Sequence, residues 1–152
     1  MEGQLHKKTV LLLTSGLLAI SSPAAPADKV LIMDLQNALS SDEFKAALGN
    51  DVAFYFIGAA KPAVKTQMEE ILINKRTTLS LGPQEANCRR VLLAAFRDLQ
   101  ARARKRGGDA VVNLVSFYRE HYTADSTMVE CHSSSDVRGH IILRGNIAQL
   151  DK

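Results

Sequence analysis

The segment GPQEANCRRVLLAAFRDLQARARKRGG, residues 82–108, carries the strongest helical pattern in the chain. Pro83 suits the first helical turn, with Gly82 before it as the predicted N-cap, and Gly107 followed by Gly108 predicts the end. Between these limits apolar side chains recur every three or four residues and form a single stripe made of Cys88, Leu92, Ala95, Phe96, Leu99 and Ala103. We therefore expect one long helix whose stripe is buried against a second layer.

Three segments with the pattern of β-strands follow this helix. DAVVNLVSFYRE, residues 109–120, is largely apolar on both alternating faces, which predicts a strand in the middle of a sheet. STMVECHS, residues 126–133, and VRGHIILRGNIAQL, residues 137–150, predict two more strands. In the last of these Ile141, Leu143 and Ile147 share one face, whereas His140 and Arg144 lie on the other, more polar face.

The residues before the long helix predict shorter elements. Val30 to Met33 indicate an edge strand or extended arm, and residues 52–57 and 64–78 are interpreted mainly as strands. Ser40 with Glu43 matches a capping box, so a short helix is expected over residues 41–48, ended by Gly49. The predicted fold class is α+β: one long helix packed on a mostly antiparallel sheet, with a short N-terminal helix.

The N-terminus resembles a secretory signal peptide. Lys7 and Lys8 precede TVLLLTSGLLAI, twelve residues without charge, and the small residues of SSPAAPA follow. This apolar run is shorter than the ~20 residues that a membrane-spanning helix needs. We expect residues 1–27 to be removed by a cut between Ala27 and Asp28, which leaves residues 28–152 as a single periplasmic domain without a transmembrane segment.

The two cysteines are expected to point toward the same core. Cys88 lies on the helical stripe, and Cys131 shares a strand face with Val129, while His132 lies on the opposite face with Glu130. In the oxidising compartment that the leader predicts, this arrangement favours a disulfide. Two buried free thiols are the alternative.

A metal site built from His121, His132 and His140, with Cys131 or Asp136, is a further alternative. These residues match no specific zinc spacing, and the Ser, His and Asp of CHSSSDVRGH lack the G-x-S-x-G elbow of a serine hydrolase. We therefore predict no catalytic residue, metal or cofactor, although enzymatic activity stays an open question.

The charge pattern bears on partners. A net charge of +3 for the whole chain is too weak to predict nucleic-acid binding. Five cations lie off the apolar stripe of the long helix and form a candidate face for an anionic envelope component or protein: Arg89, Arg90, Arg97, Arg104 and Lys105. A solvated helix face is the competing interpretation.

The chain resembles a family of small exported proteobacterial proteins of unknown function, often labelled "excinuclease ATPase subunit". The resemblance rests on the order of four segments: the leader, the FYF segment, EANCRRVLLAAFRDLQARARKRGGDAVVNLVSFY and STMVECHS. The resemblance covers most of the mature chain and implies cysteines at these same two places, which supports pairing of Cys88 with Cys131. A weaker similarity, to heavy-metal-binding-like and envelope stress-sensing domains, covers one helix and one strand.

The excinuclease label does not fit the sequence. A P-loop ATPase needs G-x-x-x-x-G-K-[ST], whose backbone amides cradle phosphate, and the chain contains no such motif and no paired C-x2-C zinc module. We interpret the protein as a non-enzymatic periplasmic binding or envelope-associated module of unknown ligand. The alternative is a metal-binding protein or small metalloenzyme that uses surface histidines.

Overall fold

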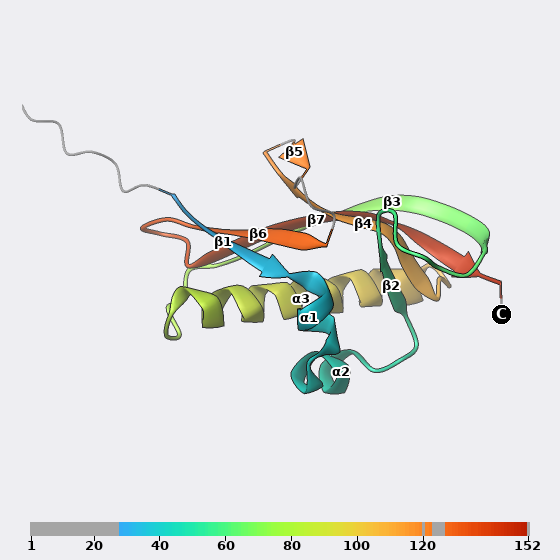
Figure 1. Ribbon diagram of the computed structural model, residues 1–152, viewed down its shortest axis with the longest axis horizontal. Helices are drawn as coiled ribbons and strands as arrows, with labels where there is room; N and C mark the ends of the chain where they lie inside the picture. Colours follow the sequence, from blue (N-terminus) through green and yellow to red (C-terminus); the bar gives the residue numbers. More distant parts are fainter. Residues whose placement is uncertain (1–27, 120, 123–126, 152) are drawn as a thin grey trace, which may run out of the picture.

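The computed structural model describes residues 28–119, 121–122 and 127–151 (Figure 1). The predicted signal peptide lies outside these residues. In chain order the elements are β1 (Lys29–Asp34), α1 (Leu35–Ser40), α2 (Asp42–Leu48), β2 (Ala53–Phe56), β3 (Val64–Thr77), α3 (Gln84–Lys105), β4 (Ala110–Tyr118), β5 (His121–Tyr122), β6 (Met128–Ser133) and β7 (Gly139–Leu150). Within the described ranges, no helix has the length and apolarity to cross a membrane.

The predicted α+β class is confirmed. The strands form one sheet in the order β1-β6-β7-β4-β2, with β3 paired to β7 and β5 to β4. Every described pairing is antiparallel except that of β2 with β4. The three helices lie on the same side of this sheet, with α3 running beneath it in about the direction of β7 (Figure 1). The other face of the sheet is therefore free of helices in the described part of the chain.

The core fills the space between α3 and the sheet. All six residues of the predicted stripe are fully buried, and so are the inward residues of β7, namely Ile141, Leu143 and Ile147. Phe96 lies at the centre of this layer, where its ring meets Phe54 and Phe44 edge-on at centroid distances of 4.9 Å and 6.2 Å. The 3.6-residue period of the helix thus positions one face for burial, as the sequence predicted.

Two predicted helix caps are shifted by one residue. Pro83, not Gly82, occupies the N-cap of α3, and no side chain caps that end. The N-cap of α2 is Ser41 rather than Ser40, because the Ser41 hydroxyl accepts a hydrogen bond from the Phe44 amide. Ser40 instead ends α1, an additional helix that the sequence did not predict. Phe44 then stands where a capping box would need Glu or Gln, so the predicted capping box is wrong.

The two glycines after α3 have different functions. Gly107 adopts a left-handed φ of 73°, a backbone conformation that would be strained in a residue with a side chain. The amides of Gly107 and Gly108 donate to the carbonyls of Arg104 and Ala103, the pattern of a Schellman cap. At Gly108 a Cβ atom would lie 2.5 Å from the Ile147 side chain. Gly108 therefore allows the end of α3 to approach β7 closely.

A β-bulge in β4 overturns part of the predicted alternation. Its pairing with β7 shifts between Val112 and Val115, and Asn113 takes a left-handed φ of 53°. As a result Val111 and Leu114 both join the main core, although strict alternation would place them on opposite faces. The extra residue changes which face each later residue of β4 occupies.

Candidate functional site

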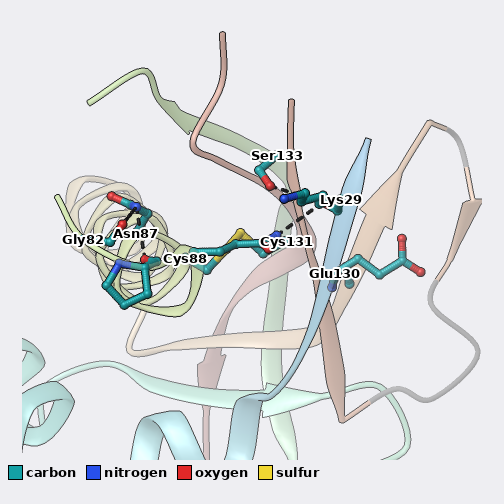
Figure 2. The surroundings of a disulfide bond; sticks show 10 residues. Lys29, Gly82, Asn87, Cys88, Glu130, Cys131 and Ser133 are labelled. Atoms are coloured by element: carbon teal, nitrogen blue, oxygen red, sulfur yellow. Dashed lines mark hydrogen bonds between the residues drawn. A yellow bond between two sulfur atoms is a disulfide. The ribbon is translucent and has the colours of Figure 1, made fainter. Parts of the chain in front are cut away.

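The predicted disulfide is present in the structure. Cys88 in the first turns of α3 and Cys131 in β6 are both fully buried and joined, with their Cα atoms 5.9 Å apart (Figure 2). That separation lies in the range normal for a disulfide. The bond ties the start of α3 to the sheet, so neither cysteine is available as a thiolate ligand or nucleophile.

A polar pocket of about 360 Å³ lies beside this disulfide, lined by residues that include Lys29, Asn87, Ser133 and Arg138. Its buried polar groups have partners (Figure 2). The Asn87 amide donates to the carbonyls of Gly82 and Pro83, and the Ser133 hydroxyl donates to the Lys29 carbonyl. These contacts give the buried groups a structural function without any ligand.

The face of the sheet opposite α3 carries a second cluster, which we call the histidine pocket. It has a volume of about 340 Å³ and is lined by Asp28, Tyr118, Arg119, His132, Ser134, Val137 and His140. His132 and His140 lie directly opposite each other on β6 and β7. Because neighbouring residues of a strand point to opposite faces, Cys131 faces the core while His132 faces this pocket.

Tyr118 reaches the histidines because of the course of β4. After Ser116, β4 no longer pairs with β7, and its last residues pair with β5, which rises above the sheet (Figure 1). The Tyr118 ring stacks on that of His132, with centroids 3.4 Å apart and planes 7° from parallel. It meets His140 edge-on at 5.4 Å. The tyrosine therefore covers His132 from the solvent side.

This cover makes His132 a buried residue, whereas the sequence predicted a surface histidine. The residue is 8 % exposed. Its Nε2 lies 2.9 Å from Glu130 Oε2, so that the neighbouring carboxylate holds one end of the ring. Its Nδ1 has no hydrogen-bond partner and is the only buried side-chain nitrogen or oxygen in this state among the described residues. The carboxylate oxygen Oδ2 of Asp28 lies 3.6 Å from Nδ1.

Asp28 is also the acidic partner of Arg119 in this pocket. Arg119 Nη2 lies 3.7 Å from Asp28 Oδ2, and its guanidinium lies over the Tyr118 ring at 5.4 Å from the centroid. Sequence reasoning did not identify Asp28, Arg119, Glu130 or Tyr118 as site residues. The spacing of Glu130 and His132 on one strand face could have indicated their contact, but nothing local indicates that Tyr118 or Asp28 reaches the same place.

The metal site of three histidines, the alternative raised by the sequence, is not assembled among the described residues. His140 Nε2 contacts Asn74 Oδ1 at 2.8 Å, Cys131 is in the disulfide, and the His121 side chain lies outside what the structure describes. Among the described residues there is no group of three or more His, Cys, Asp or Glu side chains that could hold a metal ion.

The candidate basic face is divided by internal contacts. Arg89 pairs with Glu43 at 2.9 Å, and Arg90 donates to the Leu81 carbonyl at 2.9 Å. Arg104 binds Asp51, and this guanidinium holds the pKa of the Asp51 carboxyl below its usual value. Arg97 and Lys105 are exposed. Three of the five cations are thus already engaged by the domain itself.

His140 is expected to make stability depend on pH. Burial, followed by repulsion from His132, Arg76 and Arg119, lowers the pKa of His140 below the ordinary histidine value, although Asp28 acts in the opposite direction. As pH falls from that unfolded-state value toward the lower folded pKa, the unfolded chain takes up a proton that the folded chain does not. Stability is therefore lost on acidification through this window.

The measurement is urea unfolding of wild type and His140→Gln at pH 7.5 and near pH 5. The variant should show a smaller loss of unfolding free energy between the two pH values. Equal losses in both proteins would contradict the shift assigned to His140.

No family model, curated protein or solved structure matches the chain. The resemblance to a family of small exported proteins therefore stays a prediction.

Proposed function

We propose that the protein is exported to the periplasm, loses its leader between Ala27 and Asp28, and acts there as a non-enzymatic binding module whose ligand enters the histidine pocket. The leader-like N-terminus supports export. The buried disulfide suits an oxidising compartment, where such bonds form and persist.

The main support for this pocket as the binding site is the Nδ1 atom of His132, which has no hydrogen-bond partner. A buried polar atom without a hydrogen bond costs roughly 1–3 kcal/mol, a penalty that a ligand can remove by supplying the missing partner. Tyr118 and Glu130 hold the ring from its face and from Nε2, so little conformational freedom is lost when a ligand binds. By contrast, the buried polar groups of the pocket beside the disulfide are already satisfied.

The proposal is tested by recording the histidine-ring resonances of the periplasmic protein by NMR. Its ligand is expected in the low-mass fraction of a periplasmic extract, so we expect this fraction to shift the His132 ring signals. The same fraction is also tested after a chelating resin has removed its metal ions. A shift that is lost after this treatment indicates a metal ion, and a shift that remains indicates an organic ligand. Arg97→Ala, an exposed change on α3, is the matched control and should respond as wild type does.

In His132→Gln the response of the remaining pocket residues, such as His140 and Tyr118, should be lost. If neither fraction shifts any resonance of the histidine pocket in the wild type, the assignment of this pocket as the binding site is wrong.

A further inference from the structure

We infer that the histidine pocket takes a divalent late transition-metal ion, held by His132 Nδ1, the Asp28 carboxylate and the α-amino group that leader removal frees on Asp28. This inference deepens the proposed function and rests on its cut between Ala27 and Asp28. It differs from the three-histidine site considered from the sequence, because it uses one histidine and a main-chain amine.

The argument begins with two acceptors that face each other. Ionised carboxylates only accept hydrogen bonds, so the 2.9 Å contact with Glu130 assigns the ring proton of a neutral His132 to Nε2. Nδ1 then presents a lone pair toward Asp28 Oδ2, 3.6 Å away, which is an acceptor as well. A cation placed between the buried Nδ1 and the exposed Asp28 carboxylate satisfies both acceptors.

The spacing suits a metal ion as that cation. Ligands at about 2.1 Å from a tetrahedral ion lie about 3.4 Å from each other, close to the 3.6 Å that separates Nδ1 from Asp28 Oδ2. Glu130 supplies a further feature of metal-binding histidines, which almost always donate the other ring N–H to a carboxylate or carbonyl. The buried ring, its outer carboxylate and its facing acid are thus arranged as half of a metal site.

The third donor comes from maturation. In the precursor the Asp28 nitrogen is a peptide amide, which is a poor ligand. After the cut it becomes an α-amine with a pKa of about 7.7–8.0 in model peptides, so an ion can displace its proton near neutral pH. The amine and the side-chain carboxylate of one aspartate close a six-membered chelate ring on the same ion. The precursor therefore lacks a donor that the mature protein has.

The donor types indicate the class of ion. An amine, an imidazole and a carboxylate form a nitrogen-rich set that suits Cu²⁺, Ni²⁺ and Zn²⁺ better than Mg²⁺ or Ca²⁺, which prefer oxygen. Among these ions we expect Cu²⁺ to bind most tightly, in accordance with the usual order of stability. Three protein donors leave at least one position of the ion for a ligand in the pocket.

The experiment uses protein expressed as the full chain with its own leader and recovered from the periplasm without a tag. Intact mass establishes that it begins at Asp28, after which a chelator removes bound ions. Calorimetric titration with Cu²⁺ alone and Zn²⁺ alone should then show one site per molecule. Acetylation of the α-amine near pH 6.5, where lysine side chains stay protonated, should weaken this binding at least about tenfold.

Three variants complete the design. His132→Gln should abolish the site, and Glu130→Gln, which changes a positioning residue, should weaken it by about 10–100-fold. Arg97→Ala should bind as wild type does. Because His132→Gln could perturb the fold, each variant is first compared with wild type by thermal unfolding, and α-amine acetylation tests the same site without any change of sequence.

Each other outcome overturns the inference in an identifiable way. If wild type binds no ion while the metal-stripped extract still shifts the pocket resonances, the proposed binding function stands and the metal inference fails. If binding survives acetylation but is lost in His140→Gln, a two-histidine site is correct instead. If neither ions nor extract affect the pocket, both proposals are wrong.

Discussion

Removal of the Cys88–Cys131 disulfide is expected to lower the free energy of unfolding by up to about 4 kcal/mol. The bond spans a sequence separation of 43 residues, and the chain-entropy model gives about 4 kcal/mol for a loop of that length. Both sulfurs are fully buried between α3 and the sheet, so the Cys88→Ala/Cys131→Ala double variant also loses a small apolar contact. Urea unfolding of wild type and double variant measures the difference.

The single variants provide the internal control. Each of them breaks the same bond, so each should lose most of what the double variant loses, and the three losses should be far from additive. Labelling of thiols in denatured, unreduced protein from the periplasm should find no free cysteine in wild type. Two labelled cysteines, or an unchanged unfolding midpoint in the double variant, would contradict a stabilising cross-link.

Replacement of Phe96 by alanine is expected to destabilise the domain by about 3–5 kcal/mol, the usual cost of removing a buried phenylalanine. The ring is fully buried at the middle of α3, and its edge-on contacts with Phe44 and Phe54 connect α2 and β2 to the helix. The alanine variant loses these contacts and leaves a cavity where three elements meet. Chemical denaturation is again the measurement.

Two matched changes make this result specific. Phe96→Leu, which keeps much of the buried volume, should lose clearly less than the alanine variant. Arg97→Ala changes the exposed neighbour in the same helix and should stay within about 0.5 kcal/mol of wild type. A loss below about 1 kcal/mol in Phe96→Ala would show that the core does not depend on this ring.

These predictions separate the two faces of the sheet. The face toward α3 provides stability through the disulfide and the aromatic contacts of Phe96. The opposite face holds the histidine pocket, whose buried His132 lacks a partner at Nδ1. Substitutions at Phe96 should therefore act on unfolding, whereas Glu130→Gln should act mainly on binding.

Local periodicity was sufficient to predict the α+β class and the direction of both cysteines. The stripe of α3 and the alternation along β6 and β7 depend only on how a helix or strand orients successive side chains, and that geometry holds wherever the element lies. These patterns alone predict that the side chains of Cys88 and Cys131 face the same core, and therefore favour a disulfide between them.

Only the tertiary structure decided the details that make the candidate site. The bulge at Asn113 changes which face later residues of β4 occupy, and the departure of β4 from β7 brings Tyr118 over His132. Asp28 reaches the same ring because β1 pairs with β6 at the opposite end of the sequence. Each of these contacts depends on how distant strands pair, and local side-chain patterns do not specify that pairing.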